Sequence, residues 1–101
     1  MFDQFTKVHV GFPAVDTRLA EEDRDALEFQ RRIGANVRQW RLQRALTLED
    51  FAKRCGKPIA AVDQIETGAT MASLEFLWRA ARVLDVSCLV LTDQQEDRSA
   101  A

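Results

Sequence analysis

The sequence predicts an all-α fold of five helices, preceded by an N-terminal extension. Two observations predict it: apolar residues recur at helical spacing, and helix-capping residues stand at the ends of these apolar stretches. No apolar run is long enough to span a membrane. At 101 residues the chain has room for one domain with one core. We expect the extension over residues 1–28, the helical domain over 29–92 and a polar tail over 93–101.

The N-terminal extension carries mixed signals. The stretch from Phe5 to Phe12 alternates apolar and polar residues, which is typical of a short strand, although an extended arm fits equally well. From Thr17 onward apolar residues recur near helical spacing, so a helix either runs into the first domain helix or breaks near Asp25. This extension could dimerise the protein, cover the core or cap the domain.

Two short helices with a tight turn between them are the most informative feature. Thr47 is a good N-cap, and Gly56 suits the left-handed position that ends a helix. Pro58 suits the first turn of the next helix, which Gly68 stops. The inward residues would be Phe51, Ala52, Cys55, Val62 and Ile65. This arrangement is typical of a helix-turn-helix, whose second helix, about residues 58–67, normally enters the DNA major groove.

The chain beyond Gly68 predicts one more full helix and a short apolar segment. Ser73 is its N-cap, and its inward residues would be Leu74, Leu77, Ala80, Ala81 and Leu84. The run from Cys88 to Leu91 is either a fifth helical turn or a strand. Both cysteines, Cys55 and Cys88, stand among apolar residues, so we expect them to be buried and reduced.

The charged residues are unevenly distributed. Residues 1–28 hold three cations and seven anions, residues 29–57 eight cations and two anions, and residues 58–101 three cations and seven anions. The basic block coincides with the first helices of the domain and predicts a surface for DNA phosphates. The alternative is a solvated face paired with the acidic ends. An acidic extension lying over the basic face could itself mimic phosphate.

In order and spacing, the segments resemble the Xre/Cro-type helix-turn-helix family of phage repressors and small bacterial regulators. The resemblance covers roughly residues 30 to 92, and its pieces are Ile33-Gly34-Ala35-Asn36-Val37, Leu46-Thr47, Gln64-Ile65-Glu66-Thr67-Gly68 and Leu84-Asp85-Val86-Ser87. It implies a phage-repressor-like five-helix DNA-binding domain. It also implies a bacterial, cytoplasmic regulator that needs no cofactor and binds double-stranded DNA as a homodimer.

The resemblance further implies roles for individual residues. Arg41 and Glu66 hold the positions of a partly buried ion pair between the first helix and the recognition helix. Base edges would be contacted by Gln64, Asp63, Ala60 and Ile59. Phosphates would be contacted by Thr47, Arg38, Arg44, Lys57 and Thr67. The amide of Gln64 can bond adenine through two hydrogen bonds, whereas Asp63 is unfavourable beside phosphates unless it accepts from a cytosine amine.

The sequence departs from the family pattern in the surface that would read DNA. The residue after Thr47, commonly a phosphate-binding Gln, is Leu48, and the often basic loop after the recognition helix is the uncharged Ala69 to Ala72. The leading hypothesis is a sequence-specific regulator, either a homodimeric repressor or an antitoxin-like autoregulator. The alternative is a protein-interaction module in which the apolar stretch from Pro58 to Val62 meets a protein partner.

Composition argues against other classes of function. With one histidine, His9, and no Gly-rich phosphate loop, the chain offers no constellation for an enzyme. Without a His/Cys cluster a metal site is not expected. Trp40 and Trp78 are expected to pack in the core rather than stack on bases. The N-terminus lacks the pattern of a secretion signal, so we expect neither secretion nor membrane insertion.

Overall fold

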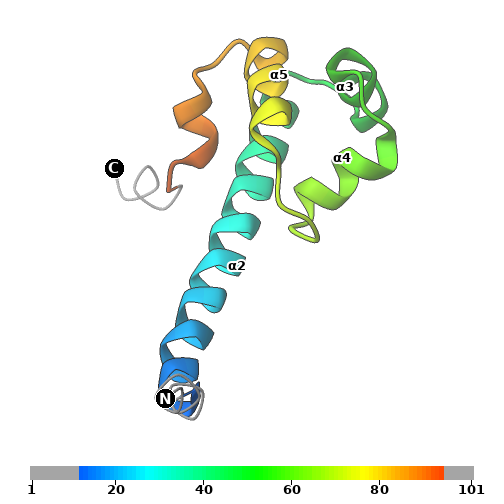
Figure 1. Ribbon diagram of the computed structural model, residues 1–101. Helices are drawn as coiled ribbons and strands as arrows, with labels where there is room; N and C mark the ends of the chain where they lie inside the picture. Colours follow the sequence, from blue (N-terminus) through cyan, green and yellow to red (C-terminus); the bar gives the residue numbers. More distant parts are fainter. Residues whose placement is uncertain (1–11, 95–101) are drawn as a thin grey trace.

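The computed structural model describes residues 12–94, and within them every regular element is helical. The elements are α2 (Phe12–Gln43), α3 (Leu48–Cys55), α4 (Ile59–Glu66), α5 (Leu74–Leu84) and the short 3-10 helix η1 (Cys88–Thr92). The long α2 runs through the molecule, with α3 and α4 on one side of its upper half and η1 on the other (Figure 1). The all-α prediction is therefore confirmed. The run from Cys88 to Leu91, for which a helical turn and a strand were both open, forms part of the 3-10 helix η1.

The first helix is longer than the sequence analysis predicted. It begins at Phe12 rather than near Thr17 and passes Asp25 without a break. Nothing between Pro13 and Gly34 interrupts a helix, and a proline in the first turn is tolerated. The predicted strand falls almost entirely on residues outside the described range. Side chains 20–29 are all exposed, so this acidic part of the extension does not lie over the basic face of its own domain.

The predicted helix ends depend on local capping, and most are confirmed. The Thr47 hydroxyl accepts a hydrogen bond from the Asp50 amide, and the Ser73 hydroxyl accepts one from the Phe76 amide. Gly56 and Gly68 have φ angles of 72° and 82°, which suit glycine. Pro58 is the N-cap of α4 rather than its first helical residue.

The core lies where α2, α3, α4, α5 and η1 meet. Its largest fully buried side chains are Phe51, Phe76, Ile33, Leu84, Leu91, Val37 and Val62. The rings of Phe51 and Phe76 pack edge to face, with centroids 6.3 Å apart. None of the helices in the described part of the chain combines the length and apolarity that a membrane crossing requires.

Two apolar residues of α5 do not pack as predicted. Leu74 is 85% exposed and Trp78 is 54% exposed. The buried face of α5 is centred on Phe76, Leu77 and Ala80. Leu74 precedes Trp78 by four positions, so helical geometry places both residues on the same outer face. Trp40, in contrast, packs against the core as expected.

The two cysteines differ in exposure, so the prediction that both are buried is wrong for Cys88. Cys55 lies in the core, whereas η1 turns Cys88 outward and buries Leu91 instead. Burial raises the pKa of the Cys55 thiol from 9.0 to about 11, partly offset by Arg79 and Lys57 nearby. At neutral pH this thiol therefore stays protonated and unreactive.

We expect a thiol reagent such as Ellman's to modify one of the two cysteines in the native protein and both in urea. The Cys88→Ser variant should show no rapid native reaction, whereas Cys55→Ala should keep it. Rapid native modification of Cys55 would contradict the buried position of this thiol.

Candidate nucleic-acid interface

The exposed side of α4 presents one continuous face. Its members are Ile59, Ala60, Asp63, Gln64 and Thr67, which are all exposed and which we call the recognition face. Their spacing places them on one side of the helix. The opposite side carries Val62, Ile65 and Glu66, which are buried against the rest of the domain. All four residues predicted to contact bases thus share one accessible surface.

The buried side of α4 is fixed to α2 by a charged pair. Arg41 Nε donates to Glu66 Oε2 at 2.8 Å and Arg41 Nη2 donates to Glu66 Oε1 at 3.0 Å, a bidentate arrangement. The two side chains are only 10% and 4% exposed. Arg41 Nη1 also donates to the Leu46 carbonyl at 2.9 Å, so the same guanidinium ties the start of the helix-turn-helix to α2.

Close backbone packing also sets the position of α4 on α2. A Cβ at Gly34 would stand 2.1 Å from the Ile65 carbonyl oxygen and 3.0 Å from that of Glu66. The Gln30 amide donates to the Gly68 carbonyl at 2.8 Å, just beyond the end of α4. These contacts and the ion pair hold the recognition face rigidly on the long helix.

A hollow of about 450 Å³ borders the N-terminal end of α4. Its lining residues are Glu49, Asp50, Ala52, Lys53, Lys57, Pro58 and Ile59. Lys57, one of the predicted phosphate contacts, already has an anionic partner, because its Nζ lies 2.8 Å from Glu75 Oε1. The hydrogen bonds from Lys57 and then Arg79 hold the pKa of Glu75 below its ordinary value. A phosphate at Lys57 would therefore compete with Glu75 for the charge of this ammonium group.

We expect Glu75→Gln to strengthen binding to duplex DNA and steepen its salt dependence. The neutral side chain releases Lys57, and each additional phosphate neutralised changes the slope of log K against log salt by about −0.9. Fluorescence anisotropy over a salt series measures this slope. Glu28→Gln makes the same charge change in the exposed segment of α2 over residues 20–29 and should leave the slope unchanged. Equal slopes for wild type and Glu75→Gln would contradict a phosphate contact by Lys57.

A second hollow, of about 300 Å³, borders the C-terminal end of α4. It is lined by Arg38, Arg41, Leu48, Asp63, Glu66 and Thr67. The structure thus brings the exposed Arg38 of α2 beside Asp63 and Thr67 of the recognition helix. Thr67 uses its hydroxyl to donate to the Gln64 carbonyl at 3.3 Å. Thr47, whose hydroxyl caps α3, immediately precedes Leu48 at this hollow.

Arg44, also predicted to contact phosphate, makes structural contacts within the domain. Its Nε donates to the Leu84 carbonyl at 2.7 Å, and its guanidinium lies 5.2 Å from the centre of the Trp40 ring. It therefore satisfies a carbonyl at the C-terminal end of α5, where a cation is also favourable. This contact gives Arg44 a structural role, and its predicted phosphate contact stays a prediction.

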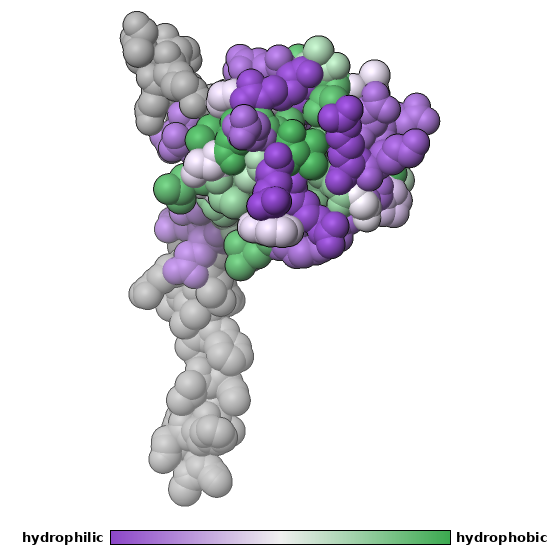
Figure 2. Space-filling model, turned by 90° about the horizontal axis from the view of Figure 1, so that it is seen from above, coloured by the Kyte–Doolittle hydropathy of each residue, from purple (hydrophilic) through white to green (hydrophobic). Residues whose placement is uncertain are grey.

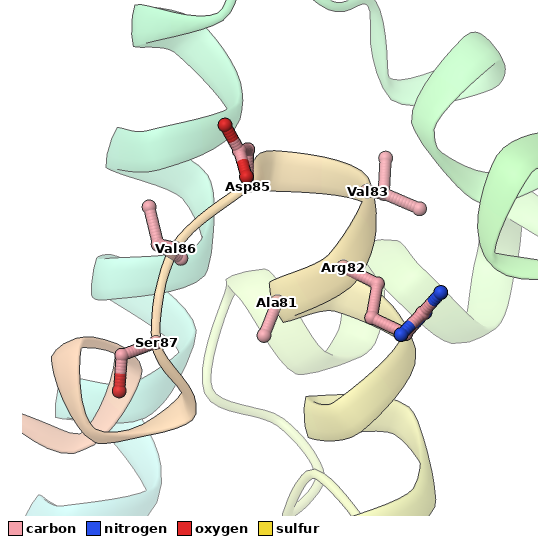
Figure 3. Close-up of a pocket in the computed structure, with 6 residues that line it drawn as sticks. All are labelled: Ala81, Arg82, Val83, Asp85, Val86 and Ser87. Carbon is pink, nitrogen blue, oxygen red and sulfur yellow. The ribbon is translucent and has the colours of Figure 1, made fainter.

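A further hollow, of about 600 Å³, lies at the end of α5 (Figure 3). It is lined by Ala81, Arg82, Val83, Asp85, Val86 and Ser87. The charged groups of Arg82 and Asp85 point away from each other, and Arg82 lies 5.1 Å from the Trp78 ring centre. Because these polar groups do not converge, this hollow lacks the character of a ligand site.

Asn36 is a structural residue that the sequence analysis missed. It is fully buried on α2, and its Nδ2 donates to the Leu91 carbonyl at 2.9 Å and to the Asp93 carbonyl at 2.7 Å. These bonds fix η1 to α2. The sequence held one sign of this structural role, because Asn36 is a single amide side chain within the apolar stripe that contains Ile33 and Val37.

The sequence match of the chain to known families agrees with this geometry. The model of a helix-turn-helix family, HTH_3, matches residues 37–91, more than half of the chain. The chain belongs to this helix-turn-helix family. The match includes α3, α4 and α5 but not the first part of α2. Among curated proteins, none matches the sequence significantly.

Solved structures with the helix-turn-helix fold include known regulators. The restriction-modification controller protein C.AhdI from Aeromonas hydrophila is 26% identical, with 61% of this chain and 94% of that chain covered and a TM-score of 0.59. The N-terminal DNA-binding domain of SinR from Bacillus subtilis is 30% identical, with 62% and 93% covered and a TM-score of 0.59. SinR, the master regulator for biofilm formation, in complex with DNA is 32% identical, with 60% and 98% covered and a TM-score of 0.58.

Proposed function

We propose that this chain is a sequence-specific DNA-binding transcriptional regulator that acts as a homodimeric repressor with α4 in the major groove. The observation that carries the proposal is the exposed recognition face, held on α2 by the buried Arg41–Glu66 pair. The likeness to SinR, which was solved in complex with DNA, supports the same use of the fold here. An antitoxin-like autoregulator would use the same surface.

The recognition face would read bases mainly through one amide. Gln64 donates to and accepts from an adenine edge, which is worth about 1–3 kcal/mol of discrimination against other bases. Ile59 and Ala60 contact thymine methyl groups, and Asp63 accepts from a cytosine amine. With so few polar groups, much of the specificity must come from one or two base pairs in each half-site.

Phosphate contacts would lie on either side of the recognition face. Arg38 and Thr67 border one end of α4 and Lys57 the other, and Thr47 stands at the start of α3. A dimer would double this set of contacts and bind two half-sites about 34–36 Å apart. Each half-site contact then contributes twice to the affinity.

An Ile59→Lys substitution tests whether this face binds DNA. Ile59 is 46% exposed at the start of α4, so a lysine there adds a cation beside phosphates, and we expect several-fold tighter binding to duplex DNA. Leu74→Lys adds the same charge on α5 and should change the affinity less. The measurement is an anisotropy titration at about 50 mM salt. No binding by wild type or by either variant would overturn the proposal.

A protein-interaction module is the second candidate function, and one observation favours it. Ile59, a member of the recognition face, is 46% exposed, and Met71, in the loop after α4, is 44% exposed. The recognition face itself holds no cation. The view in Figure 2 shows apolar surface interrupting the hydrophilic surface of the domain. Such a surface also suits a protein partner. In that case Ile59→Lys should abolish partner binding rather than improve DNA binding.

A further inference from the structure

Two exposed arginines of α2, Arg31 and Arg38, form what we call the arginine row. They are separated by about two helical turns, so they lie on nearly the same side of α2, about 10 Å apart along its axis. Between them stands Ala35, which is also exposed and is too short to cover either guanidinium. The arginine row is therefore an accessible line of positive charge on the surface of the long helix.

The arginine row borders the C-terminal end of α4. Arg38 lines the same hollow as Asp63 and Thr67 of the recognition face. Arg31 packs against Gly68, because a Cβ at this glycine would stand 2.8 Å from Arg31 Cγ and 3.1 Å from Arg31 Cα. The chain thus leaves α4 and enters the following loop directly beside the row (Figure 1). Both arginines therefore flank the same end of the recognition face.

Neither arginine of the row has an anionic partner among residues 12–94. The ion pairs in this part of the chain are Arg41–Glu66, Lys57–Glu75 and Arg79–Glu75. The loop from Ala69 to Ala72 holds no charged group, so the row supplies the cations at this end of α4. Two accessible guanidinium groups without a partner carboxylate are suited to a polyanion, which gains by releasing its counterions to solvent.

We propose that Arg31 binds a backbone phosphate of duplex DNA near the one bound by Arg38, so that the DNA contact extends from α4 onto α2. This inference rests on the proposed function, because it requires α4 to lie in the major groove. With α4 in the groove, groups beside its C-terminal end stand close to the phosphates that border the groove. Such contacts carry no sequence information, so Arg31 adds affinity for every sequence alike.

The salt dependence of DNA binding tests this contact. Arg31→Gln should reduce the slope of log K against log salt by about 0.9 for each bound protomer, whereas Arg31→Lys keeps the cation and should keep the slope. Arg82→Gln removes the same charge at the hollow beside the end of α5 and should leave the slope unchanged. Anisotropy titrations of the whole protein on one mixed-sequence duplex measure all three. An unchanged slope in Arg31→Gln, or an equal loss in Arg31→Lys or Arg82→Gln, would overturn the proposal.

A second pair of variants leaves both arginines in place. Ala35→Glu sets a carboxylate between them, and Ala35→Gln is its uncharged match; both residues suit an exposed helix position. Ala35→Glu should bind duplex DNA several-fold more weakly than Ala35→Gln, with a shallower salt slope, while circular dichroism shows the same thermal unfolding for both. Equal affinities of these two folded variants would contradict a phosphate beside the arginine row.

The wild-type titration separates this proposal from the proposed function. If the wild-type protein binds DNA and neither Arg31→Gln nor Ala35→Glu changes the slope, the contact by Arg31 is overturned and α4 keeps its role. If the wild-type protein binds no duplex even at about 50 mM salt, both proposals are overturned. Loss of affinity in Arg31→Gln that is equal for all sequences, together with a base preference lost only in Gln64→Ala, would support both.

Discussion

Glu66→Ala is expected to lower the free energy of unfolding by about 3–5 kcal/mol, because it leaves the guanidinium of Arg41 buried without its anionic partner. Glu66 is 4% exposed and receives two hydrogen bonds from Arg41, so water cannot replace it without opening the contact between α2 and α4. Urea unfolding followed by circular dichroism measures the loss. DNA affinity should fall as well, since the pair sets the position of the recognition helix.

The control for this prediction removes both charges. Arg41→Met combined with Glu66→Leu leaves no unpaired charge and should recover much of the stability that Glu66→Ala loses. Glu49→Ala removes a carboxylate from the exposed surface of α3 and should change the stability by less than about 0.5 kcal/mol. A loss below about 1 kcal/mol for Glu66→Ala would mean that the pair is no more than a surface ion pair.

Gly34→Ala should destabilise the fold by about 2 kcal/mol, within the range for overpacked sites, although helix propensity alone predicts the opposite sign. In an isolated helix alanine is favoured over glycine by about 1 kcal/mol. Here the added methyl group would stand 2.1 Å from the Ile65 carbonyl oxygen, which is backbone and cannot rotate away. The two helices must separate, so DNA affinity should fall together with stability.

Thermal or urea unfolding of the Gly34→Ala variant gives the sign directly. Ala35→Gly, one residue further along α2 on its exposed side, should lose about 1 kcal/mol through propensity. The two variants together separate packing from propensity. A stabilised Gly34→Ala protein would show that α2 and α4 are not in close backbone contact.

Local chemistry made the helix-turn-helix predictable from sequence. Thr47, Gly56, Ser73 and Gly68 act through neighbours a few residues away, and hydroxyl caps and left-handed turns follow from residue type. The order of these signals along the chain also indicated that the protein belongs to a helix-turn-helix family. The length of α2 could also be reasoned out, since no residue between Pro13 and Gly34 ends a helix.

Features that depend on tertiary packing were not predictable in the same way. Leu74 suits an inward or an outward position equally, and only the orientation of α5 places it outside. Lys57 and Arg44 bind partners in α5, 18 and 40 residues further along the chain. Residue type alone therefore gave no sign that these two cations already have partners within the domain. Asn36 likewise depends on where η1 ends.

Selection of bound sequences from a random duplex pool tests the central claim most directly. The wild-type protein should enrich a palindromic motif with adenine at the position read by Gln64, and Gln64→Ala should relax the preference at that position with little effect elsewhere. A salt series should weaken binding of every sequence alike through the phosphate contacts. Enrichment of no motif, with binding absent even at about 50 mM salt, would contradict a DNA-reading role for α4.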